Sequence, residues 1–201
     1  MRIGTKRGAV AAAIVGSLLW TYGCMLNHPV NMRYEPATQA KATPVGQKVK
    51  IFLAGVDDQT GGIALPGAMI VQRSMGDSLG EALRVEIPRL GFLWSENPQS
   101  ADAVLRAVAL KADANLESRS ALSSGDVIAE VAFRLTMADP RSGKALWNRE
   151  FSGQGRRTRS ATGSNAAWND AYNDAFAQAC GKIGRALESD KVAATILSSK
   201  Q

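Results

Sequence analysis

The stretch DVIAEVAFRLTMA, residues 126–138, alternates between two kinds of side chain at every position. One set is apolar throughout and consists of Val127, Ala129, Val131, Phe133, Leu135 and Met137. The other set mixes the charged residues Glu130 and Arg134 with Ile128, Ala132 and Thr136. Successive side chains of a strand point to opposite faces, so the pattern predicts a strand with one face in a core and the other in water.

The six residues that follow, DPRSGK at 139–144, have the composition of a tight turn. Pro140 presets φ for the corner, and Gly143 can adopt a positive φ. The next run, 145–153, places Ala145, Trp147 and Phe151 on one face, although Arg149 interrupts it. We therefore expect an antiparallel hairpin, with the stem of Arg149 packed and its charged head at an edge.

Further elements are expected on both sides of this hairpin. Residues 48–55 and 103–112 read as strands, the second buried on both faces, and residues 57–67 read as a loop. Apolar spacings of three and four predict helices at 72–90 and 165–187. Pro88 should kink the first or end its regular part near Glu86, and Asp190 should cap a last short helix.

The resulting order is β-α-β-β-β-α. This order predicts an α+β fold with two layers, in which two main helices cover one face of a largely antiparallel sheet. A single domain over residues 48–201 accommodates all these elements, and 45% hydrophobic residues are enough for a core.

The first residues have the features of an export signal. Arg2, Lys6 and Arg7 precede the apolar run 9–20, which is shorter than the ~20 residues that span a bilayer. The formal net charge of the chain is +6, and without these three residues it is +3. The sequence pI of about 9.6 is therefore no argument for nucleic-acid binding.

Residues 18–24, LLWTYGC, resemble the lipobox of bacterial lipoprotein precursors. The resemblance implies a signal peptide at 1–23, cleavage before Cys24, and acylation of its thiol, so that membrane lipid holds the chain. Met25 replaces the aspartate that retains such lipoproteins at the inner membrane, which favours the outer membrane. Two alternatives are an uncleaved signal anchor and ordinary secretion.

Residues 24–47 read as an extended tether between lipid and domain. Pro29, Pro36 and Pro44 interrupt helix and sheet alike, and no hydrophobic period is visible. His28 lies in this tether and is expected to be a solvated residue.

The domain itself resembles small envelope lipoproteins of the YajG family, with relatives in the N-terminal domain of TolB and in LpoB-like and CsgG-like periplasmic domains. The resemblance is carried by RLGF at 89–92, ADAVL at 101–105, the hairpin with SGKALW at 142–147, and the closing helix from Trp168. It implies a non-catalytic binding or assembly protein that faces the periplasm, and it transfers no functional residue.

Catalytic chemistry is not expected. His28 is the one histidine, which argues against a serine triad and a Cys/His metal site, and GQG at 153–155 lacks the lysine and serine of a phosphate loop. Asp170 and Asp174 lie one helical turn apart and should line a solvated face. Cys180 should be a packed, inert thiol, and Trp168, Tyr172 and Phe176 should be core. We therefore expect no catalytic residue, cofactor or metal ion.

One cluster of residues suggests a contact. Arg156, Arg157 and Arg159 fall in the expected loop 153–163, and their forked guanidinium groups suit phosphate or carboxylate. The sequence thus predicts a lipid-anchored module that meets an envelope protein or polymer through the arginine loop or the open sheet face. The alternatives are an envelope hydrolase or transferase that uses carboxylates, and a structural subunit that associates with itself through its sheet edges.

Overall fold

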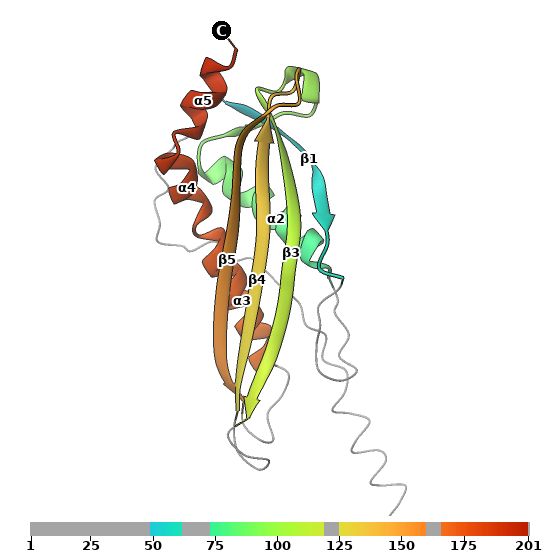
Figure 1. Cartoon of the computed structure of the whole chain (residues 1–201), viewed down its shortest axis with the longest axis vertical. Coiled ribbons are helices and arrows are strands. Elements are labelled where there is room, and N and C mark those ends of the chain that lie inside the picture. The colour runs from blue at the N-terminus through green and yellow to red at the C-terminus, as the bar shows by residue number, and fades with distance from the viewer. Residues whose placement is uncertain (1–48, 62–72, 119–124, 160–165, 201) are drawn as a thin grey trace, which may run out of the picture.

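The computed structural model describes residues 49–61, 73–118, 125–159 and 166–200. Five strands form one sheet in the order β2-β1-β3-β4-β5, with helices packed against it (Figure 1). In chain order the elements are β1 (Lys50–Asp58), α2 (Met75–Arg89), β2 (Leu93–Trp94), the 3-10 turn η1 (Pro98–Ser100), β3 (Ala103–Ser118), β4 (Gly125–Ala138), β5 (Ala145–Arg159), α3 (Ala166–Cys180), α4 (Ile183–Ser189) and α5 (Val192–Ser198).

The sheet is mixed. The expected hairpin is confirmed, because β4 pairs antiparallel with β5 and also with β3. The expectation of a largely antiparallel sheet holds only for these strands, since β1 runs parallel to both β2 and β3. The reason is α2, which carries the chain from one end of β1 back to the other, so that the following strands run in the same direction. The two-residue strand β2 was not expected.

The alternation in β4 is confirmed. Its odd-numbered residues from Val127 to Met137 are buried, and the residues between them are half-buried. The expectation that residues 103–112 are buried on both faces was wrong, because Arg106 and Lys111 are exposed on the outer face of β3. The buried side chains of β3 and β4 lie under the helices α2 and α3. No described element covers the other face of the sheet, which we call the open face.

Strand β5 is six residues longer than expected, so residues 153–159 are strand and not loop. A Cβ atom at Gly153 or Gly155 would lie 1.9 Å from the carbonyl oxygen of Ala175 or Ala171, respectively. The two glycines therefore let the backbone of α3 rest directly on β5, and they do not end the strand. Figure 1 shows α3 lying along β5 for much of its length.

Helix α2 continues past its proline. The helix does not end near Glu86 but runs through Pro88 to Arg89, because Pro88 lies in the last turn, where few backbone bonds remain to be lost. The carbonyl of Arg84 would bond the missing N–H of residue 88, and it accepts a hydrogen bond from the indole of Trp94 at 3.4 Å instead.

The expected helix 165–187 is two helices. The break falls at Gly181, the residue type other than proline that costs most inside a helix. Asp190 does not cap α5, which Lys191 precedes with a φ of 51°. The carboxylate of Asp190 instead accepts from Trp147 Nε1 at 2.8 Å and binds Arg149 Nε and Nη2 at 2.9 Å each, so it ties the C-terminal helices to β5.

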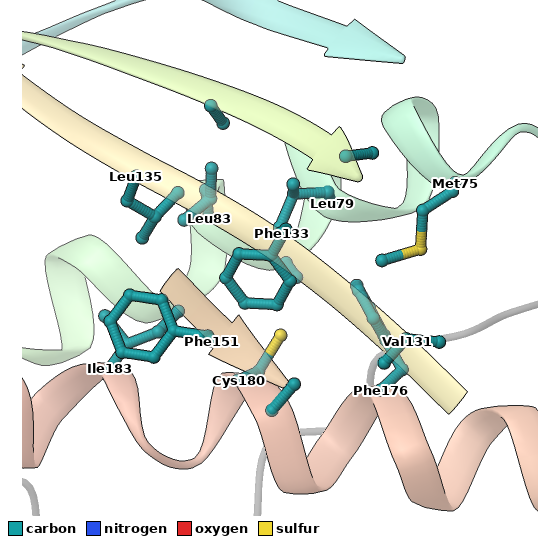
Figure 2. Packing of buried hydrophobic residues seen from close by; sticks show 14 of the residues in the cluster. Met75, Leu79, Leu83, Val131, Phe133, Leu135, Phe151, Phe176, Cys180 and Ile183 are labelled. Carbon is teal, nitrogen blue, oxygen red and sulfur yellow. The ribbon is translucent and has the colours of Figure 1, made fainter. Parts of the chain in front are cut away.

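The core lies between the sheet and the helices α2 and α3. Figure 2 shows side chains of both helices and of β4 and β5 converging around Phe133. The ring of Phe133 has its centroid 5.5 Å from that of Phe151 and 6.5 Å from that of Phe176. The expected core stripe of α3 is confirmed, because Trp168, Tyr172 and Phe176 are at most 1% exposed.

Candidate functional site

The three candidate arginines lie on strand β5, which separates them. Arg156 opposes Ile128 of β4 and points to the open face, whereas Arg157 opposes Val127 and points to the helix side. Arg159 shares the side of Arg157. The expectation of one arginine cluster in a loop is therefore wrong, because alternate residues of a strand face opposite ways.

Arg156 is bound to carboxylates of neighbouring strands. Its Nε and Nη2 lie 3.0 and 2.8 Å from Oδ2 of Asp126, and Nη2 also lies 3.3 Å from Glu117. Thr158 donates its hydroxyl to the other oxygen of Asp126 at 2.9 Å. Asp126 is only 8% exposed, so these bonds compensate the carboxylate for lost solvent.

Arg157 is bound to helix α3. Its Nε lies 2.7 Å from Oδ2 of Asp174, and its Nη2 donates to Oδ1 at 2.9 Å. The hydrogen bonds and charge of Asp174 raise the pKa of the guanidinium above its ordinary value. Asp174 is thus engaged in an ion pair, and the described residues contain no group of three or more His, Cys, Asp or Glu that could hold a metal ion.

Arg159 differs from the other two. Its Nε is buried, and within the described parts of the chain it has no hydrogen-bond partner. Of the three arginines it alone has no described carboxylate partner.

Ion pairs cross the open face from strand to strand. Lys111 of β3 pairs with Glu130 of β4, whose other oxygen accepts from Gln154 of β5 at 3.1 Å. This contact with Lys111 lowers the pKa of Glu130, and the contact with Glu130 raises the pKa of Lys111. A second pair joins Arg134 to Glu150. The face is therefore polar and internally neutralised in its middle.

A cavity of about 260 Å³ lies where the open face meets the outer edge of β5. Small residues of β4 and β5 line it together with polar side chains of the sheet and two from α3 and the turn after it. Its lining includes Ala132, Ser152, Gly153, Lys111, Glu130, Gln178 and Lys182.

Two solved structures are similar in fold to this chain. The chain shares its fold with bacterial proteins. A neuraminyllactose-binding hemagglutinin homologue from Helicobacter pylori is 16% identical with a TM-score of 0.60, covering 86% of this chain and 100% of its own. Protein XCC0632 from Xanthomonas campestris, of the family DUF330, is 13% identical with a TM-score of 0.50, covering 88% and 100%. At these identities the likeness concerns the fold. No family model matches the sequence, and no curated protein matches it either.

The structure also locates residues that the sequence pattern did not single out. Glu117 and Asp126 hold Arg156, and Gln178 and Lys182 reach the edge of β5. Extending the alternation of 145–153 through the two glycines would have indicated that Arg156 faces away from α3. The candidate lipidation site Cys24 and the tether lie outside the described residues. Among the helices that are described, none is long and apolar enough to span a membrane.

Proposed function

We propose that the chain is a cell-envelope lipoprotein that is acylated on Cys24 and acts as a non-catalytic binding or assembly module. The observation that carries the proposal is the run LLWTYGC at 18–24, which closes an apolar run of signal-peptide length that follows a basic segment. Two or three acyl chains on one cysteine anchor a protein stably, because each buried methylene contributes about 0.8 kcal/mol.

The domain would stand off from the membrane on its tether. Twenty-four residues, 24–47, precede the described domain, and an extended chain covers about 3.3 Å per residue. The tether therefore permits a reach of up to about 80 Å. The outer membrane is the proposed location, with the domain facing the periplasm.

The open face is the proposed contact surface for an envelope protein or polymer. It is uncovered in the described structure, and it carries cross-strand pairs such as Arg134 with Glu150. Arg156 and Arg157 already bind carboxylates of the chain itself. Arg159 therefore remains the arginine proposed to take an anionic group, and it would do so on the helix side of β5, outside the open face.

The anchor is tested by the intact mass of the N-terminal peptide from membrane-extracted protein, together with a Cys24→Ser variant. We expect a chain that begins at acylated Cys24, and we expect Cys24→Ser to accumulate as uncleaved precursor. A chain that retains Arg2 and carries no lipid would refute the lipoprotein proposal and indicate a signal anchor.

The contact surface is tested by photo-crosslinking in cells. A photoreactive residue at Thr136 on the open face should capture a partner, whereas the same residue at Arg185, an exposed position of α4, should capture less. Equal capture from both positions would contradict the assignment of the open face.

A further inference from the structure

Strand β5 lies at one edge of the sheet along its full length. It pairs with β4 from Ala145 to Arg159, and within the described residues no strand pairs with its other side. A long edge strand presents unpaired N–H and C=O groups that can add a strand from another chain.

The outward backbone groups of β5 belong to its even-numbered residues. Ser152 and Gln154 both bond to groups on the α3 side, so their backbones point away from β4. Because hydrogen-bonded and non-hydrogen-bonded pairs alternate in an antiparallel ladder, the N–H and C=O of Glu150 and Arg156 point the same way.

Two side chains of the α3 region occupy the middle of this edge. The N–H of Gln154 donates to Oε1 of Gln178 at 2.9 Å, and the carbonyl of Ser152 accepts from Nζ of Lys182 at 2.6 Å. Together they supply one acceptor and one donor on either side of Gly153, which is what the two residues flanking the position opposite Gly153 would supply from an added antiparallel strand.

The glycines of β5 make this contact geometrically available. Since the backbone of α3 rests on Gly153 and Gly155, the helix lies close enough for its side chains to reach around the edge of the sheet. Helix α3 and β5 thus share a contact that both fixes the helix and covers the strand.

A second copy of this chain is the partner that β5 fits if the two side chains are removed. Antiparallel pairing of two β5 strands about Gly153 would place Glu150 of each copy opposite Arg156 of the other on the open face. It would also place Arg149 opposite Arg157 on the helix side, where Asp190 and Asp174 already neutralise the two guanidinium groups. The same pairing needs the N–H of Gln154 and the carbonyl of Ser152, which are the groups already occupied.

We propose that Gln178 and Lys182 are edge guards, which keep β5 from pairing with a second copy of the chain. This inference is independent of the lipid anchor and of the open-face contact. It also opposes the alternative of self-association through sheet edges, because the β5 edge of the folded protein would be blocked by these two side chains.

The test compares the full chain with Gln178→Ala/Lys182→Ala by sedimentation over a concentration series in detergent, together with amide hydrogen exchange at Gln154. At low concentration we expect the exchange of Gln154 to be about tenfold faster in the double variant, because one hydrogen bond is lost. At high concentration we expect the double variant to form a dimer while the unmodified chain stays monomeric.

Two controls make the result specific. Gln178→Glu/Lys182→Arg keeps an acceptor and a donor at the same places and should remain monomeric, and Arg185→Ala removes one positive charge from an exposed site of α4 and should do the same. The proposal is overturned if the double alanine variant remains monomeric at every concentration, or if the unmodified chain already dimerises with Gln154 protected in the interface.

Discussion

At the scale of single residues, position 155 requires glycine because the structure leaves no space for a side chain there. A methyl group there would lie 1.9 Å from the carbonyl oxygen of Ala171, and that atom belongs to a helix backbone that cannot rotate away. Gly143 provides a contrast, since it has a φ of 70° and a methyl group added there would meet no atom within 4 Å.

We expect Gly155→Ala to lower the free energy of unfolding by about 3 kcal/mol or more, because α3 must move off the sheet. Gly143→Ala should cost only about 1 kcal/mol, which is the strain of a left-handed residue. Urea unfolding of both variants measures the difference. Equal losses would mean that α3 does not rest on β5 as described.

At the scale of elements, Asp58 joins the end of β1 to the start of α2. Its carboxylate accepts from the N–H of Gly76 at 2.8 Å and from both the N–H and the hydroxyl of Thr60, at 3.1 and 2.6 Å. Burial alone would raise the pKa of Asp58, but these hydrogen bonds outweigh it, so the pKa lies below the ordinary value of 3.8.

The lowered pKa gives a pH dependence. The charged carboxylate stabilises the native state above the unfolded-state pKa, and this contribution is lost as the pH falls through the lower folded-state pKa. At pH 7 we expect Asp58→Asn to be less stable by about 0.5–1 kcal/mol, the usual effect of a charge at a helix N-terminus. Urea midpoints should converge near pH 2, and a gap of the same size at both pH values would contradict the role of the charge.

Local sequence patterns predict where strands and helices form better than they predict which of these elements pair or pack with one another. The alternation in 126–138 depends on neighbouring residues alone, and β4 follows it. The glycines of β5 suggest a loop when only their neighbours are considered, because the reason for them lies in α3, which the chain reaches only later. The parallel direction of β1 depends on a crossover, and the bond between Arg156 and Glu117 joins residues 39 positions apart. The spacing of residues within one element cannot predict contacts between segments so far apart in the sequence.

At the scale of the whole molecule, Cys180 lies where α3, the sheet and α2 meet (Figure 2). It is a free thiol with no exposed surface. Burial raises its pKa, and the nearby charge of Glu86 acts in the same direction. The reactive thiolate is therefore scarce in the native protein even in mildly alkaline solution.

Modification of Cys180 should consequently report unfolding of the domain. In a Cys24→Ser background we expect maleimide labelling to be negligible in native buffer and to rise with urea in step with loss of structure. An added surface thiol, Ser142→Cys, should react at once and show that the reagent is active. Rapid labelling of Cys180 without urea would indicate local opening between α3 and the sheet.

The contact of α3 with Gly153 and Gly155 also bears on how far such a sequence can diverge. The helix takes its position there because Gly153 and Gly155 have no side chains. This condition can be met whatever the surrounding residues are. Substitutions could replace many polar residues of α3 and β5 while the two glycines keep the helix packed against the strand. A fold specified in this way can persist when little identity is left, and its recognisable trace would be a pair of glycines two residues apart on an edge strand.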